Sequence, residues 1–271
     1  METLSMATHS KSTTINFRVK HFSLPKDGGL IAKDLPKGIL HSHERITTEI
    51  FDDVASGSES VAQMIVSAIN EHEEDRTPRP FKLGLTTGNT PSLLYRRLAE
   101  LNKEGKVSFM NTEVFSIDEY YPCGKDSPQS RNNRLHKEFL DLVDIKPENV
   151  HIPDGTVPQE EVSDYCAEFD KFARGLDLLV IGIGEQGQVG FNEAGSTRKS
   201  RTRTVRLSYQ SRKRQAKGFN RDINATPKAA ITLGIDTMLT ASRIILMAWG
   251  EAKAEAVKAI AEGKPTPECP A

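Results

Sequence analysis

Leu176-Asp-Leu-Leu-Val-Ile-Gly-Ile183 and the turn that follows it, Gly184-Glu-Gln-Gly-Gln-Val-Gly-Phe-Asn-Glu-Ala-Gly195, decide the fold class of this chain. The first part is an almost continuous apolar run, which is typical of a strand buried on both faces of a parallel sheet. The second part is rich in glycine and carries polar side chains, among them Gln186, Gln188 and Glu193. Open α/β sheets bind small molecules beyond the carboxyl ends of their strands, so the stretch predicts a ligand site in this turn.

Strand-like and helix-like segments alternate along the rest of the chain. Short apolar or β-branched runs predict strands at residues 46–51, 81–86, 112–117, 202–207, 229–233 and 244–249. Apolar residues at helical spacing predict helices at 56–73, 94–101, 135–142, 159–174 and 251–262. This alternation predicts an α/β fold, a three-layer sandwich with a mostly parallel, Rossmann-like sheet. We interpret residues 1–44 as an irregular N-terminal extension and residues 45–271 as one domain.

The bulk properties of the chain argue against several classes of protein. Its 271 residues carry a net charge of −1, which argues against a general nucleic-acid binder or a polybasic membrane protein. No window approaches the roughly 18 consecutive apolar residues of a membrane span. The three cysteines have neither CxxC nor metal-ligand spacing, so we expect reduced thiols in the cytoplasm and no metal.

Two further turns follow predicted strands and carry suitable chemistry. In Thr86-Thr-Gly-Asn-Thr-Pro91, backbone N–H groups and hydroxyls at the start of a helix suit a phosphate group. The alternative is an ordinary helix start, with Thr90 as the N-cap and Pro91 in the first turn. Asp118 follows the strand at 112–117, where a carboxylate is well placed to act as a general base. The alternative is an acid in a solvated turn.

The glycine turn also matches the spacing of a dinucleotide-binding loop, Gly182-x-Gly-x-x-Gly187. Its context does not fit that reading. The residues after it are a poor helix start, and no acidic residue ends the next predicted strand at 202–207. We therefore expect no nicotinamide or flavin dinucleotide at this loop.

Residues 198–217 hold nine basic side chains and no acidic one. A run of this kind is usually a solvated face. The alternatives are attraction of an anionic ligand or contact with nucleic acid, although Tyr209 and Phe219 are the only aromatic residues nearby. Lys253 follows the last predicted strand, where its ammonium suits a phosphate group as a point charge; the alternative is an exposed helix lysine.

Taken together, these segments resemble the glucosamine-6-phosphate deaminase (isomerase) family, within the wider group of sugar-phosphate isomerases and 6-phosphogluconolactonases. The resemblance runs from about Ile46 to the end of the chain. Its carriers are Thr87–Pro91, Ile117–Tyr120, Gly182–Gly184, Phe191–Glu193, Ser200–Arg203, Thr232–Gly234 and Gly250–Lys253. Phe-Asn-Glu after the glycine turn separates the chain from the lactonases, which usually have Ser-Leu-Phe-Pro there.

The resemblance implies an enzyme of amino-sugar metabolism that converts glucosamine 6-phosphate to fructose 6-phosphate and ammonia without any cofactor. The residues that it places around the sugar phosphate are Thr87, Gly88, Asn89, Thr90, Lys217 and Lys253. It implies that Asp118 moves a proton between C2 and C1, and that Arg203 matches an arginine of an allosteric site. It also implies a homo-oligomer, because related enzymes are commonly oligomeric.

The chain departs from the family pattern in the glycine turn. In the pattern Gly-x-Gly-x-Asp-Gly-His-x-x-Phe-Asn-Glu, the Asp position is Gln186 here and the His position is Gln188. In the family the His opens the sugar ring, aided by that Asp and by the Glu that matches Glu193. Glutamine cannot transfer a proton near neutral pH, and general acid–base assistance is worth about 10²–10⁴ in rate. We therefore expect little deamination of the cyclic substrate.

A second departure lies at the end of the chain. The family continues past Pro270 with a further strand and helix, which leaves C-terminal truncation open. Without that last strand we expect an exposed edge of the sheet.

Three functional hypotheses remain. The first is an isomerase/deaminase of an amino-sugar phosphate, with Asp118 as the base and Glu193 assisting. The second is a non-catalytic sugar-phosphate sensor or partner subunit, motivated by Gln186 and Gln188. The third, ranked last, is a nucleic-acid-associated protein that uses the basic run at 198–217.

Overall fold

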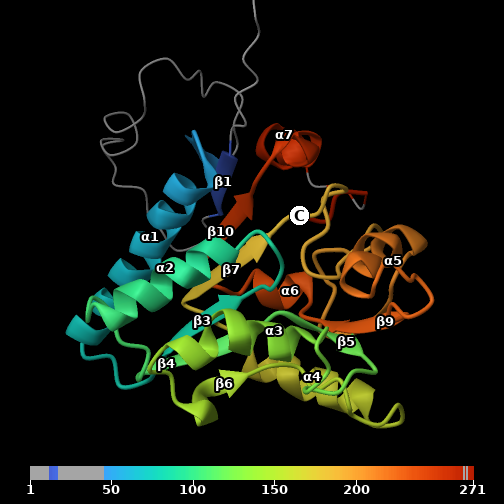
Figure 1. The fold of residues 1–271 in the computed structure, drawn as a ribbon, viewed down its shortest axis with the longest axis horizontal. Helices are drawn as coiled ribbons and strands as arrows, with labels where there is room; N and C mark the ends of the chain where they lie inside the picture. Colours follow the sequence, from blue (N-terminus) through green and yellow to red (C-terminus); the bar gives the residue numbers. More distant parts are fainter. Residues whose placement is uncertain (1–11, 18–45, 265, 267) are drawn as a thin grey trace, which may run out of the picture.

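The computed structural model describes residues 12–17, 46–264, 266 and 268–271. Its central layer is a seven-stranded sheet in the order β2-β1-β10-β7-β3-β4-β6, with helices on both faces (Figure 1). The strands are β1 Ser12–Phe17, β2 Thr47–Phe51, β3 Phe81–Leu85, β4 Thr112–Ser116, β6 Val150–His151, β7 Leu178–Gly182 and β10 Arg243–Ala248. The five strands from β10 to β6 run parallel to one another. The predicted α/β fold with a mostly parallel sheet is confirmed.

The strands of this sheet alternate between two hydrophobic cores. In β7, Leu178 and Val180 point into one core, whereas Leu179 and Ile181 point into the other. All four side chains are almost fully buried, which explains why the strand reads as a continuous apolar run. One core lies between the sheet and each layer of helices, which gives the three-layer architecture.

Helices cover each core from outside. The first core is closed by α1 Val54–Glu74, α2 Ser92–Lys103 and α3 Arg131–Glu138, and the second by α4 Val162–Phe172, α6 Ile235–Met238 and α7 Ala254–Glu262. Each long helix is amphipathic: α2, for example, buries Leu94, Leu98 and Leu101 and exposes its charged side chains. None of the described helices is both long enough and apolar enough to cross a lipid bilayer.

The first strand corrects the interpretation of residues 1–44 as irregular. β1 lies within that range and pairs antiparallel with β10 on one side and with β2 on the other. β1 therefore covers the side of β10 that faces away from β7. This strand carries no strong apolar pattern, because its first three residues are hydroxyl residues and only two of its six are apolar. The other residues of the range 1–44 lie outside the described part.

A second, smaller sheet was not predicted. It contains β5 Asp118–Tyr121, β9 Ala229–Thr232 and β8 Arg203–Arg206, all antiparallel, in the order β5-β9-β8. The chain leaves β4 at Ile117 and begins β5 at once, so Asp118, predicted to lie in a turn, is the first residue of a strand. The backbone N–H of Leu233 donates to the carbonyl of Ile117 at 2.7 Å and ties β9 to this corner.

Asp170, on α4, fastens the small sheet to the rest of the domain. It is 1% exposed, and it accepts hydrogen bonds from the backbone N–H and hydroxyl of Thr202 at 2.9 and 2.8 Å. It also accepts from the Thr237 hydroxyl and from Arg201 Nε, the latter at 2.7 Å. Burial raises the pKa of Asp170, but the hydrogen bonds outweigh burial and hold the pKa below its ordinary value. The buried carboxylate therefore joins α4, the start of β8 and α6.

We predict that Asp170→Ala lowers the free energy of unfolding by about 2–3 kcal/mol, because it leaves buried donors unpaired. The exposed acid Asp164, on the same helix, is the matched control, and Asp164→Ala should change stability by less than about 0.5 kcal/mol. Since the pKa of folded Asp170 is depressed, its contribution is present above the unfolded pKa and is lost as the pH falls through the folded one. Urea unfolding from pH 7 to pH 3 should show the wild type and Asp170→Ala converging in acid.

Candidate functional site

The order of the parallel strands places a topological switch point between β3 and β7, where a ligand crevice is expected at the carboxyl edge of the sheet. From β3 the chain proceeds to β4 on one side, and β7 later returns to the other side of β3. The loops after β3 and β7 therefore diverge from adjacent strands, and this is where open α/β sheets bind ligands. The loop after β3 spans residues 86–91, and the loop after β7 spans 183–202, of which 183–195 is the glycine turn.

The loop after β3 presents a free hydroxyl beside a helix start. Thr87 Oγ1 is buried and has no hydrogen-bond partner among the described residues. Gly88 follows with a φ of 130°, and nothing lies within 4 Å of where a Cβ would stand, so the backbone is open to an approaching group. Free N–H groups and a hydroxyl at the N-terminal end of a helix suit an anion.

Neighbouring elements hold the other residues of this loop. Asn89 accepts a hydrogen bond from Arg134 Nη2 at 2.9 Å, and the Thr90 carbonyl accepts one from Trp249 Nε1 at 2.8 Å. The alternative in which Thr90 caps the helix is wrong: the cap position is Pro91, without a side-chain capping bond, and α2 begins at Ser92. The N–H groups of the first turn are therefore not satisfied by a capping side chain.

Asp118 is a buried carboxylate at the mouth of the crevice. It is 4% exposed, and its Oδ1 accepts no hydrogen bond among the described residues. The other oxygen, Oδ2, lies beside the loop after β7, since a Cβ placed on Gly190 would stand 3.4 Å from it. Burial raises the pKa of Asp118, and the nearby guanidinium of Arg131 acts in the opposite direction. A raised pKa and an unpaired oxygen in a crevice are typical of a proton-transfer group.

Glu193 is the second carboxylate of the crevice. Its Oε1 is buried without a hydrogen-bond partner, and its Oε2 accepts from the backbone N–H of Ser208 at 3.2 Å. The preceding residue, Asn192, is fully buried and donates from its amide to the Leu233 carbonyl at 2.8 Å. Phe191 donates its backbone N–H to Thr232 Oγ1 at 3.2 Å. These bonds to the end of β9 fix the position from which Glu193 projects.

Gln188 folds back on its own loop. Its Oε1 accepts the backbone N–H of Gln186 at 3.0 Å, and its backbone carbonyl accepts the N–H of Gly184 at 2.8 Å. A Cβ on Gly184 would stand 2.1 Å from the Gln188 side chain, so a larger residue there would displace that side chain from its present position. The side chain of Gln186 is exposed. The two glutamines therefore close the turn and supply no group that can exchange a proton.

Lys253 supplies a cation near the same edge. It is half-buried at the end of a short 3-10 turn, Glu251–Lys253, that follows β10. Burial lowers its pKa, Glu185 raises it and Arg214 lowers it, so both charged side chains lie within electrostatic reach of the ammonium. Arg214 lies on α5 Tyr209–Gln215 and donates from Nη2 to Ser211 Oγ at 3.2 Å.

Lys217, the basic residue predicted from sequence spacing, is exposed on the 3-10 turn Ala216–Gly218 that follows α5. Arg214, which is partly buried on the same segment, is the basic side chain whose charge lowers the pKa of Lys253. One signal could have indicated this: Arg214 lies three residues after the buried Ser211, on the same face of α5. That signal requires knowing which face is buried, which the sequence of a short basic helix does not reveal.

Arg203 donates hydrogen bonds to other residues of the chain. Its Nη1 donates to Asn192 Oδ1 at 3.1 Å and to the Arg201 carbonyl at 3.0 Å, and its Nη2 donates to Ser196 Oγ at 2.9 Å. It therefore braces the segment that carries Glu193. Whether Arg203 also contacts a regulatory ligand stays a prediction.

Arg131, at the start of α3, is a site residue that the sequence did not mark. It is 8% exposed, and its Nε lies 3.8 Å from Asp118 Oδ1. No motif surrounds it in the sequence, because its approach to Asp118 is produced by the packing of α3 on β5.

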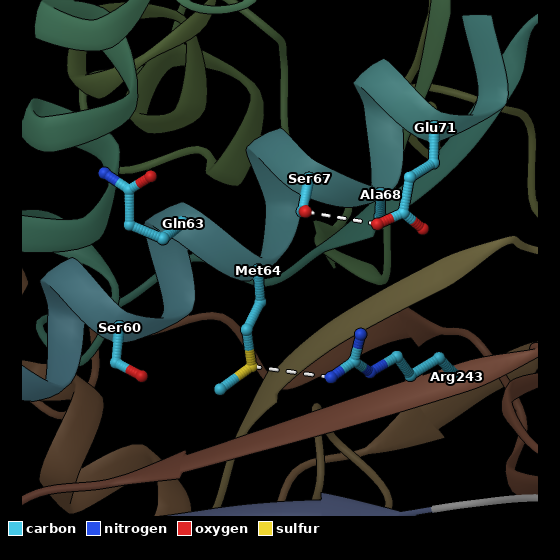
Figure 2. Close-up of a pocket in the computed structure, with 7 residues that line it drawn as sticks. All are labelled: Ser60, Gln63, Met64, Ser67, Ala68, Glu71 and Arg243. Carbon is cyan, nitrogen blue, oxygen red and sulfur yellow. Dashed lines mark hydrogen bonds between the residues drawn. The ribbon is translucent and has the colours of Figure 1, made fainter. Parts of the chain in front are cut away.

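Two further features of the described residues concern metal binding and a depression outside this site. No group of three or more His, Cys, Asp or Glu side chains there is arranged to hold a metal ion. A shallow depression of about 400 Å³ lies along α1 (Figure 2). Figure 2 shows Met64 over Arg243, joined at 3.6 Å, and Ser67 bonded to Glu71. Since Arg243 is the first residue of β10, this depression lies at the end of that strand opposite the crevice.

Comparison with known proteins gives a consistent result. Residues 52–271 match the family described as "Glucosamine-6-phosphate isomerases/6-phosphogluconolactonase". A glucosamine-6-phosphate deaminase of Phocaeicola vulgatus is 38% identical over 218 residues, which are 79% of this chain and 81% of that protein. One of Parabacteroides distasonis is 40% identical over 188 residues, 68% of this chain and 69% of that protein.

A third relative is much longer than this chain. It is a putative glucosamine-6-phosphate deaminase-like protein of Bacteroides thetaiotaomicron, 37% identical over 87% of this chain, and the match spans 35% of its length. Among solved structures, a monomeric glucosamine-6-phosphate deaminase matches with a TM-score of 0.73 and 32% identity over 80% of this chain and 88% of that one. The 6-phosphogluconolactonase of Trypanosoma cruzi, at 22% identity and a TM-score of 0.60 over 79% of this chain and 84% of that one, shares the fold.

We predict that Arg214 contributes more than Lys217 to binding a phosphate group in the crevice. Arg214→Met should weaken binding of inorganic phosphate by about tenfold, because a partly desolvated guanidinium is lost, whereas Lys217→Met should weaken it less than about twofold. NMR titration of backbone amides in the loop at 86–91 measures both. If Lys217→Met weakens phosphate binding as much as Arg214→Met or more, Lys217 is the phosphate-binding cation, as sequence spacing predicted.

Proposed function

This chain belongs to the glucosamine-6-phosphate isomerase/6-phosphogluconolactonase family, as the motifs indicated, and we propose that it converts an amino-sugar phosphate to a ketose phosphate and ammonia with weakened activity. The observation that carries the proposal is Asp118, a buried carboxylate with one unpaired oxygen and the other facing the loop after β7.

The proposed reaction is an internal proton transfer followed by hydrolysis. In the open-chain aldose, Asp118 takes the proton from C2, the electron pair of that C–H bond forms the C1–C2 double bond, and the C1=O π pair moves to O1, which takes a proton from solvent to give an enolamine. Asp118 then returns the proton to C1 while the nitrogen lone pair forms the C2=N bond, which leaves a protonated imine at C2. Water adds to this carbon, and ammonia departs with release of the extra proton to solvent, giving the ketose phosphate. A base whose pKa is raised by burial is stronger toward the weakly acidic C2–H, provided that it is still ionised at the working pH.

The phosphate end of the ligand is assigned to the opposite side of the crevice. The proposed contacts are Thr87, Gly88, Asn89, Thr90 and Lys253, with Arg214 supporting them and Lys217 as the alternative cation. The support is the free Thr87 hydroxyl, the uncapped start of α2 and the half-buried ammonium of Lys253. These groups select a dianionic phosphate over a neutral sugar.

The weakened activity follows from the glycine turn. Ring opening needs a group that removes the proton of the C1 hydroxyl and protonates the ring oxygen. Glu193, with a free Oε1, is the residue proposed to assist there, but Gln186 and Gln188 offer it no acidic or basic partner. We therefore assign the chain to open-chain molecules of the substrate, whether these form spontaneously or are delivered by another enzyme.

One observation favours a second candidate function, a sugar-phosphate sensor without turnover. The Gln188 side chain is engaged in closing its own turn, so the turn is closed by a side chain that cannot transfer a proton. A sensor would keep the phosphate contacts and dispense with proton transfer.

The nucleic-acid hypothesis is weakened by the contacts of the basic run. Arg203 braces Asn192, Arg201 binds Asp170, and Arg212 donates from Nη2 to the Ile223 carbonyl at 2.6 Å. These guanidinium groups are used within the chain, so the run does not form a continuous stripe of free cations.

Assembly and location stay predictions. A related structure is described as monomeric, so the expected homo-oligomer needs a direct measurement. Cys123, Cys166 and Cys269 are free thiols in the structure, which is compatible with the proposed cytoplasmic location.

We predict slow release of ammonia from glucosamine 6-phosphate, and loss of that release by at least about 100-fold in Asp118→Asn, because the amide cannot act as a base. Coupled ammonia detection gives the rate, and calorimetry with the same ligand shows whether binding persists. Binding without release in the wild type would support the sensor instead. A rate equal to that of ordinary family enzymes would contradict the weakened activity.

We also predict that the double variant Gln186→Asp, Gln188→His gains ring-opening capacity. The rate on the cyclic sugar should rise by about 10²-fold if the imidazole reaches the crevice, within the usual range for general acid–base assistance. The control is Gln188→Asn, which removes the turn-closing contact without adding a base. A gain of the same size in Gln188→Asn would show that the turn, and not proton transfer, limits the wild type.

A further inference from the structure

Arg131 and Asp118 face each other as two buried, incompletely satisfied charges. Their side chains are 10% and 6% exposed, and Nε lies 3.8 Å from Oδ1. Neither atom has a hydrogen-bond partner among the described residues. Most buried polar atoms in proteins are hydrogen-bonded, so two adjacent exceptions of opposite charge in a ligand crevice call for a functional explanation.

The guanidinium of Arg131 is held in place by its surroundings. It lies over the ring of Tyr120 at 4.7 Å and over that of Phe191 at 5.3 Å, in cation–π contacts. Its backbone N–H donates to Glu119 Oε1 at 2.9 Å. The cation is therefore fixed between the strand that carries Asp118 and the loop after β7.

The other titratable groups around Asp118 have different partners. On β5, Glu119 accepts backbone N–H groups at the start of α3, and the Tyr120 hydroxyl donates to Gln215. On α2, the Tyr95 hydroxyl donates to the Thr86 carbonyl.

Further along α3, Arg134 and Glu138 pair with each other at 2.7 Å. At the end of β9, Thr232 is the strand partner of Asp118, and neither Thr232 nor Gly190 carries a titratable side chain. Arg131 is therefore the cation that acts on this carboxylate.

We propose that Arg131 is the positioning residue of the base: it holds Asp118 with Oδ1 toward α3 and Oδ2 toward Gly190, and it keeps the carboxylate ionised so that Oδ2 can take the C2 proton. The inference rests on the proposed function of the site. Arg131 stays protonated throughout and transfers nothing. Its charge offsets the effect of burial, which by itself would favour the neutral acid and remove the base.

The direct test is the titration of Asp118 by carbon-detected NMR in protein labelled at the Asp carboxyl groups, with Asp118→Asn to assign the signal. In Arg131→Met the titration midpoint should rise, because a cation that stabilises the ionised form is lost. In Arg131→Lys it should stay close to that of the wild type. Arg79→Met is the control. Arg79 precedes the first residue of β3 and pairs with Asp177 at 2.6 Å, so this variant removes a cation that has a different carboxylate partner.

A midpoint that is the same in Arg131→Met as in the wild type, or that moves equally in Arg79→Met, would overturn the inference. The labelled signal does not require turnover. If the wild type releases no ammonia, the proposed function is wrong, but the titration of Asp118 still tests the role of Arg131.

The kinetic test separates positioning from packing. In Arg131→Met the acid limb of kcat/KM against pH should move to higher pH, with a loss of about tenfold or more on that limb and a smaller loss on the plateau. Arg131→Lys should restore the acid limb. A plateau lowered without any movement of the limb would show that Arg131 only packs against Tyr120 and Phe191, and would overturn the inference.

Discussion

The burial of β7 and β10 on both faces is the constraint on which the rest of the structure depends. Their side chains alternate between two cores, so helices must cover both faces and the connections between parallel strands must cross over the sheet. Because of these crossovers, the carboxyl ends of all the parallel strands lie at the same end of the sheet. Because β3 is followed by β4 on one side and flanked by β7 on the other, the loops after β3 and β7 start at a topological switch point, which is where open α/β sheets bind ligands.

The small antiparallel sheet turns this switch point into a site. β5 continues directly from β4, and the bond between Leu233 and Ile117 holds β9 against the same corner. Asp118 is buried by this arrangement, and the loop after β7 is fixed to the end of β9 through the Asn192 side chain. A proton-transfer group needs such fixing, since a misplacement of about 1 Å can cost about 10²-fold in rate. The same contacts bury the carboxylate and so raise its pKa, which makes the nearby cation Arg131 consequential.

In the proposed function, the groups that move the proton are separate from the loop that opens the ring. Asp118 and Glu193 each keep an unpaired oxygen, whereas Gln188 uses its carboxamide to close the turn. The groups proposed to bind the phosphate and to move the proton lie mainly in the loop after β3 and at the start of β5, whereas the residues proposed to act in ring opening lie in the loop after β7. Since these groups lie on different elements, ring opening can be lost while phosphate binding and proton transfer persist, which would allow either a slow enzyme or a sensor.

The α/β class, most strands of the parallel sheet and the family could be read from the sequence, because apolar runs and glycine turns are local patterns. The absence of a proton-carrying side chain at positions 186 and 188 is equally a matter of sequence. The tertiary structure was needed to show that Ser12–Phe17 joins the sheet, that residues 118–121, 203–206 and 229–232 form a second one, and that Arg131 approaches Asp118. Strand pairing and the approach of two charges depend on which faces meet in space, and residues far apart in the chain carry no local signal of that meeting.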